Sequence, residues 1–471
     1  MPNEFDMTVR NGLLVTPSGV VRADVGIREG TIATIAASLP EGREEEVVEA
    51  EGCYVLPGVV DAHVHFNDPG FPEREDMASG TAAAAAGGVT TVIDMPLSGR
   101  PAAISVEALE LKKEAGKLRA KVDYALWGGL VDDNVDEMEA MSQAGAIAFK
   151  AFTCFAGDDF PYATSEVLYK GMKEAARLGL LIGVHCEDQA LTAWGEIEAR
   201  KKGTTRSFLD AHSPLTEVLA VNAVLEMART TGARVHICHA TLPEVVDAVT
   251  RAHTEGVRVT VETCPHYLLF TEEDLEKMGP VLKCTPPVRS PEAVEGMWKR
   301  VFDGAVELVG SDHSPSTMSQ KNVIIQAQGG AHSAESDLID PPETPNGGNF
   351  MSAWGGVQGV QTLLPALFTE GVKKRGLPIE QLVCLLSRNP ARLFGLYPRK
   401  GSLRVGNDAD MAIFDPRERW ILRPKDLLHK NPHSPYLGFS FQGRVKTTIS
   451  HGKIVYADGR ARDTRGVLLL K

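Results

Sequence analysis

The chain has 471 residues, which exceeds the usual size of one domain, so one large domain and a smaller one are expected. Its formal charge of −13, without a long basic run, argues against nucleic acid or an anionic membrane as a partner. The sequence has no apolar run of about 18 residues, no basic-then-apolar leader and no CxxC among its seven cysteines, so we expect a cytoplasmic protein with reduced thiols.

Both ends of the chain share one pattern. Residues 7–56 and 401–471 read as short alternating strands that Gly and Pro separate. Because chain ends often lie close together, the economical prediction is one small β-sandwich domain formed by both termini, from residues 1–56 and 401–471.

The middle of the chain, residues 57–400, has a different pattern. Short β-branched runs alternate with helical stretches, and eight such runs can be counted from "GVVDAHVHF" to "VELVGSDHSP". This alternation predicts a parallel (β/α)8 TIM barrel. A doubly wound open sheet is the competing α/β arrangement, but no GxGxxG follows an early strand.

The first of these runs, residues 58–70 ("GVVDAHVHFNDPG"), carries two histidines one residue apart. Positions i and i+2 of a strand share a face, so His63 and His65 point the same way. Two imidazoles at a strand end suit a metal ion, but an isolated HxH is more often a hydrogen-bonded structural pair. A metal site therefore needs further ligands elsewhere in the chain.

Chemistry in such a barrel takes place at the carboxyl ends of the strands. Candidate ligands at these ends are Lys150, His185, Asp312 and either His236 or His239, of which we choose His239 because it is nearer the strand's end. Each alone has a structural explanation, but independent roles would not place these types at one end of strands 1, 4, 5, 6 and 8. Four histidines and a carboxylate suit Zn, Fe, Co or Mn better than Mg or Ca.

Lys150 is the unusual member, since lysine is rarely buried without a partner. Burial and nearby metal ions both favour the neutral amine, which can react with CO2 to form a carbamate. Two carbamate oxygens can bridge two metal ions, and a bridging hydroxide then forms near neutral pH because bound metal lowers the pKa of water.

At this point the sequence resembles the cyclic amidohydrolases of the amidohydrolase superfamily, namely dihydroorotase, hydantoinase (dihydropyrimidinase) and allantoinase. The motifs "PGVVDAHVHFNDPG", "AGGVTTVIDMPL", "FKAF", "GVHCED", "HICHA", "TCPHYL", "KCTPPVR" and "GSDHSP" occur in family order. The resemblance implies a distorted (β/α)8 barrel, a homotetramer and two divalent metal ions, zinc being favoured. It assigns as metal ligands His63, His65, N6-carboxylated Lys150, His185, His239 and Asp312, and makes Asp312 the catalytic proton shuttle as well.

Three features of this sequence differ from the patterns of dihydroorotases or hydantoinases and so distinguish among the members of this branch. Asn67 stands where dihydroorotases have an Arg that would bind the substrate carboxylate, and Phe155 stands where hydantoinases have a Tyr. The stretch "AWGGVQGVQ" at 353–361 replaces the hydantoinase PNG loop. The resemblance is therefore greatest to allantoinases, which hydrolyse a ring amide of the cyclic ureide allantoin to allantoate in purine breakdown. A hydantoinase is the alternative activity, and a metal-free binding protein is the alternative of another class.

The resemblance also suggests how the substrate is held. The ureido group would lie near Asn67 and Ser98, where allantoinases usually have Asn at the second position. Phe155 cannot donate a hydrogen bond, so His266 is expected to help the metals stabilise the oxyanion. Backbone groups at Thr285 and around Gly355 would bind the ring. Residues 316–349 are long and polar, and either a lid or a surface insertion would explain them.

Overall fold

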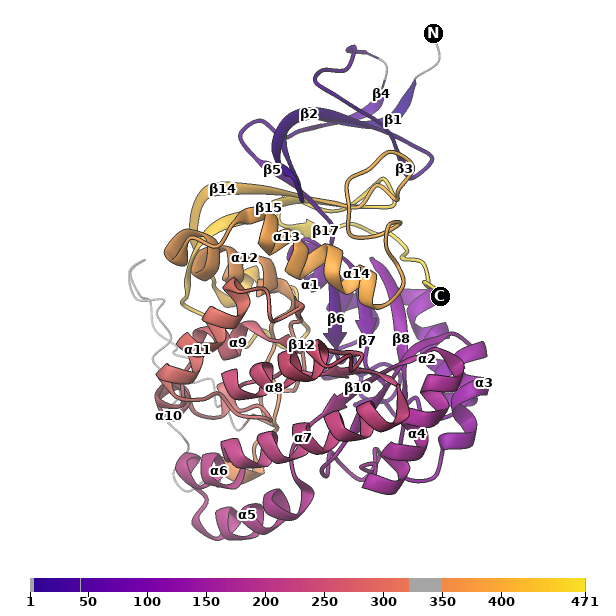
Figure 1. Ribbon diagram of the computed structural model, residues 1–471. Helices are drawn as coiled ribbons and strands as arrows, with labels where there is room; N and C mark the ends of the chain where they lie inside the picture. Colours follow the sequence, from indigo (N-terminus) through magenta and orange to yellow (C-terminus); the bar gives the residue numbers. More distant parts are fainter. Residues whose placement is uncertain (1–3, 43, 322–349, 471) are drawn as a thin grey trace.

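Two β-sheets organise the chain, and the larger part of it is a barrel of strands wrapped by helices (Figure 1). The computed structural model describes residues 4–42, 44–321 and 350–470. Among these residues, none of the helices is long and apolar enough to cross a membrane. Most of the predicted lid, residues 322–349, lies outside the described residues.

The barrel sheet has eight strands in sequence order, and all neighbouring pairs run parallel. The strands are β6 (Val59–Val64), β7 (Val89–Asp94), β8 (Asp123–Gly129), β9 (Ala146–Phe152), β10 (Leu181–His185), β11 (Arg234–Ile237), β12 (Val259–Thr263) and β13 (Leu308–Val309). A parallel bridge between Val64 and His313 joins the two edges and nearly closes the barrel. Strands such as β6 are buried along their whole length, which explains their continuous apolar runs.

Helices surround the barrel and connect its strands. They are α1 (Met77–Ala86), α2 (Val106–Arg119), α3 (Met138–Gln143), α4 (Ser165–Leu178), α5 (Gln189–Lys202), α6 (Thr205–Ala211), α7 (Pro214–Thr231), α8 (Pro243–Thr254), α9 (Pro265–Leu269), α10 (Glu272–Met278), α11 (Pro291–Phe302), α12 (Leu363–Leu367), α13 (Ile379–Val383) and α14 (Asn389–Leu393). Local sequence fixes their ends. The N-cap of α5 is Asp188, whose side chain accepts from Leu191 N, and its C-cap is Gly203, which has a left-handed φ of 70°. Helices α5 and α6 form an addition between β10 and α7, at the end of the barrel away from the other sheet (Figure 1).

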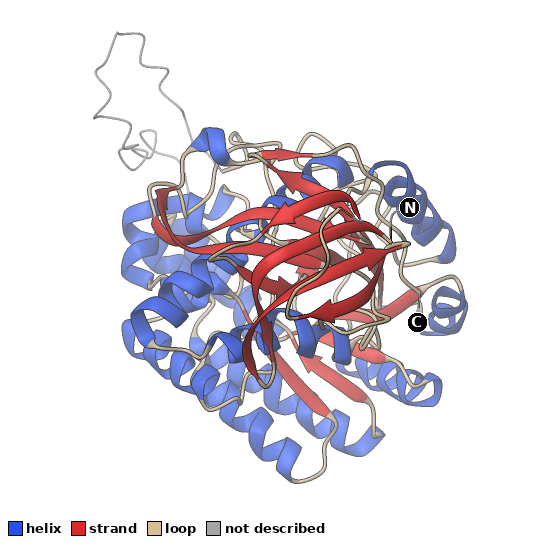
Figure 2. Cartoon of the chain, turned by 90° about the horizontal axis from the view of Figure 1, so that it is seen from above, coloured by secondary structure: helices blue, strands red, loops and turns tan. Residues whose placement is uncertain are grey.

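The second sheet is built from both ends of the chain. It contains β1 (Phe5–Thr16), β2 (Gly19–Arg28), β3 (Thr31–Ala36), β4 (Glu44–Glu49), β5 (Tyr54–Pro57), β14 (Met411–Ile421), β15 (Ser440–Ser450), β16 (Lys453–Ala457) and β17 (Arg460–Ala461). The two halves meet where β5 pairs with β14 in antiparallel fashion, and Figure 2 looks down on the joined sheet. The predicted fold class, a barrel with a β domain formed by both termini, is confirmed; boundaries near residues 57 and 400 stay a prediction.

A buried charge cluster joins the β domain to the barrel. Lys400 Nζ lies 2.6 Å from Asp410 Oδ2 and 2.9 Å from Asp408 Oδ2, and it also contacts Asp123, the first residue of β8. The Lys400 side chain is 1% exposed. One ammonium therefore compensates carboxylates from both parts of the chain at the end of the barrel opposite the predicted ligands.

Candidate metal centre and active-site cavity

The predicted metal ligands gather at the carboxyl ends of the barrel strands. His185 ends β10, His65 and His239 follow β6 and β11 closely, and Asp312 follows the short strand β13. All are at least 91% buried. Residues that are scattered over some 250 positions of sequence are thus brought to one point by the barrel topology.

The ring nitrogens of this cluster face one another. His63 Nε2 lies 3.3 Å and His65 Nε2 lies 3.1 Å from Asp312 Oδ1. His185 Nδ1 lies 3.1 Å from His239 Nε2. Because His63, His239 and Asp312 each offer one donor atom within 4.8 Å of the others, the group can hold a metal ion.

The structure also distinguishes between the two histidines of "HICHA". His239 faces the cluster, whereas His236 Nδ1 lies 2.8 Å from Thr260 Oγ1 and its Nε2 lies 3.3 Å from Glu262 Oε2. The three-residue separation turns the two side chains apart, so His239 is the one brought to the other predicted ligands.

Lys150 lies inside the barrel, in β9, and is fully buried. Its Nζ has no hydrogen-bond partner among the described residues and lies 5.0 Å from the centre of the Phe152 ring. The residues paired with it in the neighbouring strands are Gly129 and Gly183, against which Phe160 and Trp127 pack closely. A buried polar group without a hydrogen-bond partner is costly, so the surroundings of Lys150 Nζ leave it in want of a ligand.

Two buried glutamates hold the ligand histidines in orientation, and our sequence analysis missed both. Glu262, in β12, bonds to His63 Nδ1, which leaves Nε2 of that ring facing Asp312. Glu187 Oε2 lies 2.8 Å from His185 Nε2, which leaves Nδ1 facing His239. Carboxylates behind metal-binding imidazoles fix the tautomer and raise ligand basicity.

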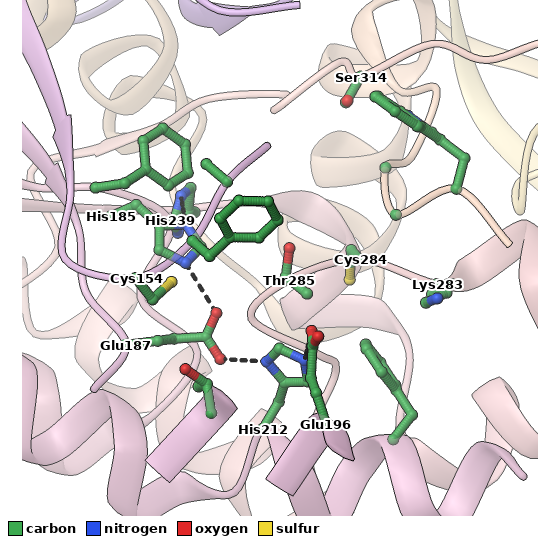
Figure 3. Close-up of a pocket in the computed structure, with 18 of the residues that line it drawn as sticks. Cys154, His185, Glu187, Glu196, His212, His239, Lys283, Cys284, Thr285 and Ser314 are labelled. Atoms are coloured by element: carbon green, nitrogen blue, oxygen red, sulfur yellow. Dashed lines mark hydrogen bonds and ion pairs between the residues drawn. The ribbon is translucent and has the colours of Figure 1, made fainter. Parts of the chain in front are cut away.

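Glu187 also connects the predicted metal cluster to residues that lie outside it. Glu187 Oε1 accepts from His212 Nδ1 at 2.8 Å, and His212 Nε2 lies 3.3 Å from Glu196 Oε1 (Figure 3). Although burial alone would lower it, Glu187 and Glu196 raise the pKa of His212 to about 9. A charged imidazolium between two carboxylates thus links the cluster to helix α5.

Burial controls the protonation of the ligands themselves. It lowers the pKa of His65 to about 4 and lowers the pKa values of His185 and His239. Burial alone would raise the pKa of Asp312, but the neighbouring rings of His63 and His65 hold it well below its usual range. Neutral imidazoles and an ionised carboxylate are the forms that bind metal.

Two ligand positions also have strained backbones. His239 has a φ of 38° and Asp312 a φ of 44°, a left-handed region that residues other than glycine rarely adopt. Such strain costs on the order of 1–3 kcal/mol and is concentrated at functional sites. Asp312 lies three residues beyond the end of β13, and its carboxylate faces the histidines.

A cavity of about 470 Å³ opens over the cluster, a size suited to a small ligand (Figure 3). Its walls include His63, His65, His185, His239 and Asp312. Four of the predicted substrate residues also line it: Ser98, Phe155, Thr285 and Gly355.

Asn67 and His266 are not among the lining residues of this cavity in the described chain. Asn67 is 1% exposed, and its Nδ2 donates to the backbone oxygen of Ser98, a lining residue, at 2.9 Å. His266 is also 1% exposed, and one of its ring nitrogens lies within 4.8 Å of a carboxylate oxygen of Asp312. A contact between Asn67 and the substrate stays a prediction, and His266 lies beside Asp312, the predicted proton acceptor.

Curated proteins that are similar over nearly the whole chain are allantoinases. The chain is 43% identical over 462 residues to the allantoinase of Rubrobacter xylanophilus, covering 97% of this chain and 95% of that protein. It is 39% identical to the allantoinase of Solibacter usitatus (96% and 93% covered) and 38% identical to that of Deinococcus radiodurans (99% and 98% covered).

Solved structures show the same architecture. The L-hydantoinase (dihydropyrimidinase) of Arthrobacter aurescens superposes with a TM-score of 0.90 at 31% identity, covering 99% of this chain and 100% of that one. The dihydropyrimidinase of Brevibacillus agri gives 0.86 at 26% identity, with 98% and 97% covered. A family model described as "Amidohydrolase family" matches residues 54–455. The candidate metal ligands therefore lie in a barrel of known type, and the chain belongs to the amidohydrolase family.

Proposed function

We propose that this protein is an allantoinase that hydrolyses a ring amide of allantoin to give allantoate. The observation that carries the proposal is that five of the predicted ligands line one cavity, namely His63, His65, His185, His239 and Asp312. The sixth, Lys150, is buried in the barrel strand β9. The names of the relatives support the substrate, since three allantoinases match nearly the whole chain. A metal-free binding protein would have no reason to keep these donors buried together.

We propose that the cluster holds two divalent metal ions, with zinc favoured and iron, cobalt or manganese as alternatives. His63 and His65 would bind one ion, His185 and His239 the other, and Asp312 would complete the set. Carboxylation of Lys150 would supply the bridge, and the buried, unpartnered Nζ supports this. Bound ions of this kind polarise a carbonyl group and make water a better nucleophile.

The residues of this chain would then divide the remaining work. Asp312 would accept the proton of the attacking water and deliver it to the leaving ring nitrogen, as general acid–base catalysis requires. Its ionised state, held by the neighbouring imidazoles, suits the first of these steps. Thr285 and Gly355, which line the cavity, would bind the planar ring, and His266 would support the oxyanion from beside Asp312.

The experiment is the hydrolysis of allantoin, hydantoin, dihydrouracil and dihydroorotate by one preparation under one metal condition. We expect the highest kcat/KM for allantoin. Dihydroorotate should be a poor substrate, because Asn67 stands where dihydroorotases have an Arg to bind its carboxylate. The missing charged hydrogen bond should cost about 1.5–3 kcal/mol of transition-state binding. The second candidate is a hydantoinase, which the TM-score of 0.90 with an L-hydantoinase favours. A tenfold or greater advantage of hydantoin or dihydrouracil over allantoin would select it.

We further propose that the protein is a cytoplasmic homotetramer, as the resemblance to cyclic amidohydrolases implies. Its formal charge of −13 suits a protein that remains dissolved at high concentration. The mass in solution, measured by light scattering, tests the tetramer: four times the chain mass of 50.8 kDa is expected, and a stable monomer would contradict it.

A further inference from the structure

The residues that line the active-site cavity differ in chemistry. Leu97 and Ala156 offer apolar surface, whereas Glu196 and Arg200 of helix α5 offer charged groups. Phe155, also a lining residue, bonds through its backbone N–H to Gln189 Oε1 at the start of this helix. A ring bearing a polar tail would therefore meet different partners according to which way the tail points.

Helix α5 presents one continuous face to the cavity. The lining residues of this helix are Gln189, Thr192, Ala193, Glu196, Ile197 and Arg200. Their spacing of three and four residues places them on one side of an α-helix, along about three turns. The helix is capped at both ends, by Asp188 and Gly203, and its face forms one wall of the cavity.

Glu196 is the acceptor on this wall. Its side chain is 33% exposed and directs its carboxylate into the cavity beside His212 (Figure 3). Oε1 lies 3.3 Å from His212 Nε2, and Oε2 accepts from Arg200 Nη2 at 3.0 Å. A carboxylate has about four acceptor positions, so these contacts leave capacity for a ligand.

Arg200 places a donor next to this acceptor. Its side chain is 59% exposed, lines the cavity and stands one helical turn from Glu196. The pair thus offers a carboxylate that accepts and a guanidinium that donates, side by side on one helix face.

We propose that Glu196, with Arg200 beside it, forms the subsite that binds the ureido tail of the substrate and makes the enzyme select a ring that carries one. The inference rests on the proposed function, since only a substrate with such a tail can use this subsite. A terminal ureido group has several N–H donors and one carbonyl acceptor in a plane. Its N–H groups would bond to Glu196, and its carbonyl would accept from Arg200.

The competing explanation is that Glu196 acts only through its neighbours. It contacts His212, which bonds to Glu187, which in turn orients the ligand His185. In that case the loss of Glu196 would disturb the metal cluster and would slow every substrate equally. The two explanations therefore differ in whether the substrate's tail matters.

The test compares allantoin with hydantoin, which has the same ring without the tail, in the wild-type enzyme and in Glu196→Gln and Glu196→Ala. Hydantoin is measured both as a substrate and as a competitive inhibitor of allantoin hydrolysis. Glu198→Gln is the matched control, because Glu198 lies on the same helix, is exposed and pairs with Lys201 away from the cavity wall. Metal content per chain is recorded for all variants.

When a substrate loses one hydrogen bond to a charged group of the enzyme, kcat/KM typically falls about 10- to 100-fold. We expect this loss for allantoin in Glu196→Ala, a smaller one in Glu196→Gln, and hydantoin values and metal content within about twofold of wild type. An equal fall for both substrates, or no fall for allantoin, would overturn the subsite while leaving the proposed function intact. A wild-type enzyme that opens hydantoin but not allantoin would overturn the proposed function, and the subsite with it.

Discussion

Replacing Glu262 by Gln should weaken metal binding without unfolding the protein. Glu262 and His63 are each 1% exposed and bonded to each other, and this contact keeps His63 Nε2 directed at Asp312. The amide removes the negative charge behind the imidazole but keeps the shape of the side chain. Loss of such a partner typically lowers metal affinity about 10- to 100-fold, which corresponds to about 1.4–2.8 kcal/mol.

The assay is competition for the metal with a chelator of known affinity, followed by the metal content per chain. Glu198→Gln serves as the control for a change of charge on the surface, and the melting temperature of the metal-loaded variant checks that the barrel is intact. A Glu262→Gln protein that retains wild-type metal affinity would refute the reasoning, because His63 would then be oriented without this carboxylate.

Three further substitutions test other parts of the account. Asp312→Asn should still bind metal but lose about 10²–10⁴-fold in kcat, because the amide cannot accept a proton; a kcat near wild type would require another base. Lys150→Ala should lose most activity and metal, with partial rescue by short carboxylic acids in an activity titration, and unaided activity would exclude the bridge. Lys400→Met should lower the free energy of unfolding by about 3–5 kcal/mol, since it leaves the buried Asp410 without its ammonium partner and Asp123 with His451 alone; denaturant unfolding measures this.

The barrel could be predicted from the sequence because its strands are short, mostly buried runs rich in apolar residues, and helical patterns separate these runs. The same reasoning located Lys150, His185, His239 and Asp312, because ligands in this fold must lie at the carboxyl ends of strands. The helices α5 and α6 were not predicted individually, since nothing in their composition distinguishes an added pair from a connecting helix.

The residues that hydrogen-bond to the predicted ligands were harder to predict. Glu187 stands two residues after His185, which is a weak signal for a partner, while Glu262 and His212 approach the site from distant parts of the chain. Asn67 was expected in the cavity because of its place in the first motif. Its side chain instead bonds to the backbone of Ser98, a contact that depends on how two loops meet and that no sequence period records.

The most direct test of the central claim is the fate of allantoin in water labelled with heavy oxygen. If the protein hydrolyses a ring amide, the metal-loaded wild-type enzyme should convert allantoin to allantoate with one labelled oxygen per turnover, located in the new carboxylate by mass spectrometry. Removal of the metal by a chelator should abolish this product, and its return should restore it. A metal-loaded enzyme that leaves allantoin unopened, or that opens it without label in the carboxylate, would contradict the account.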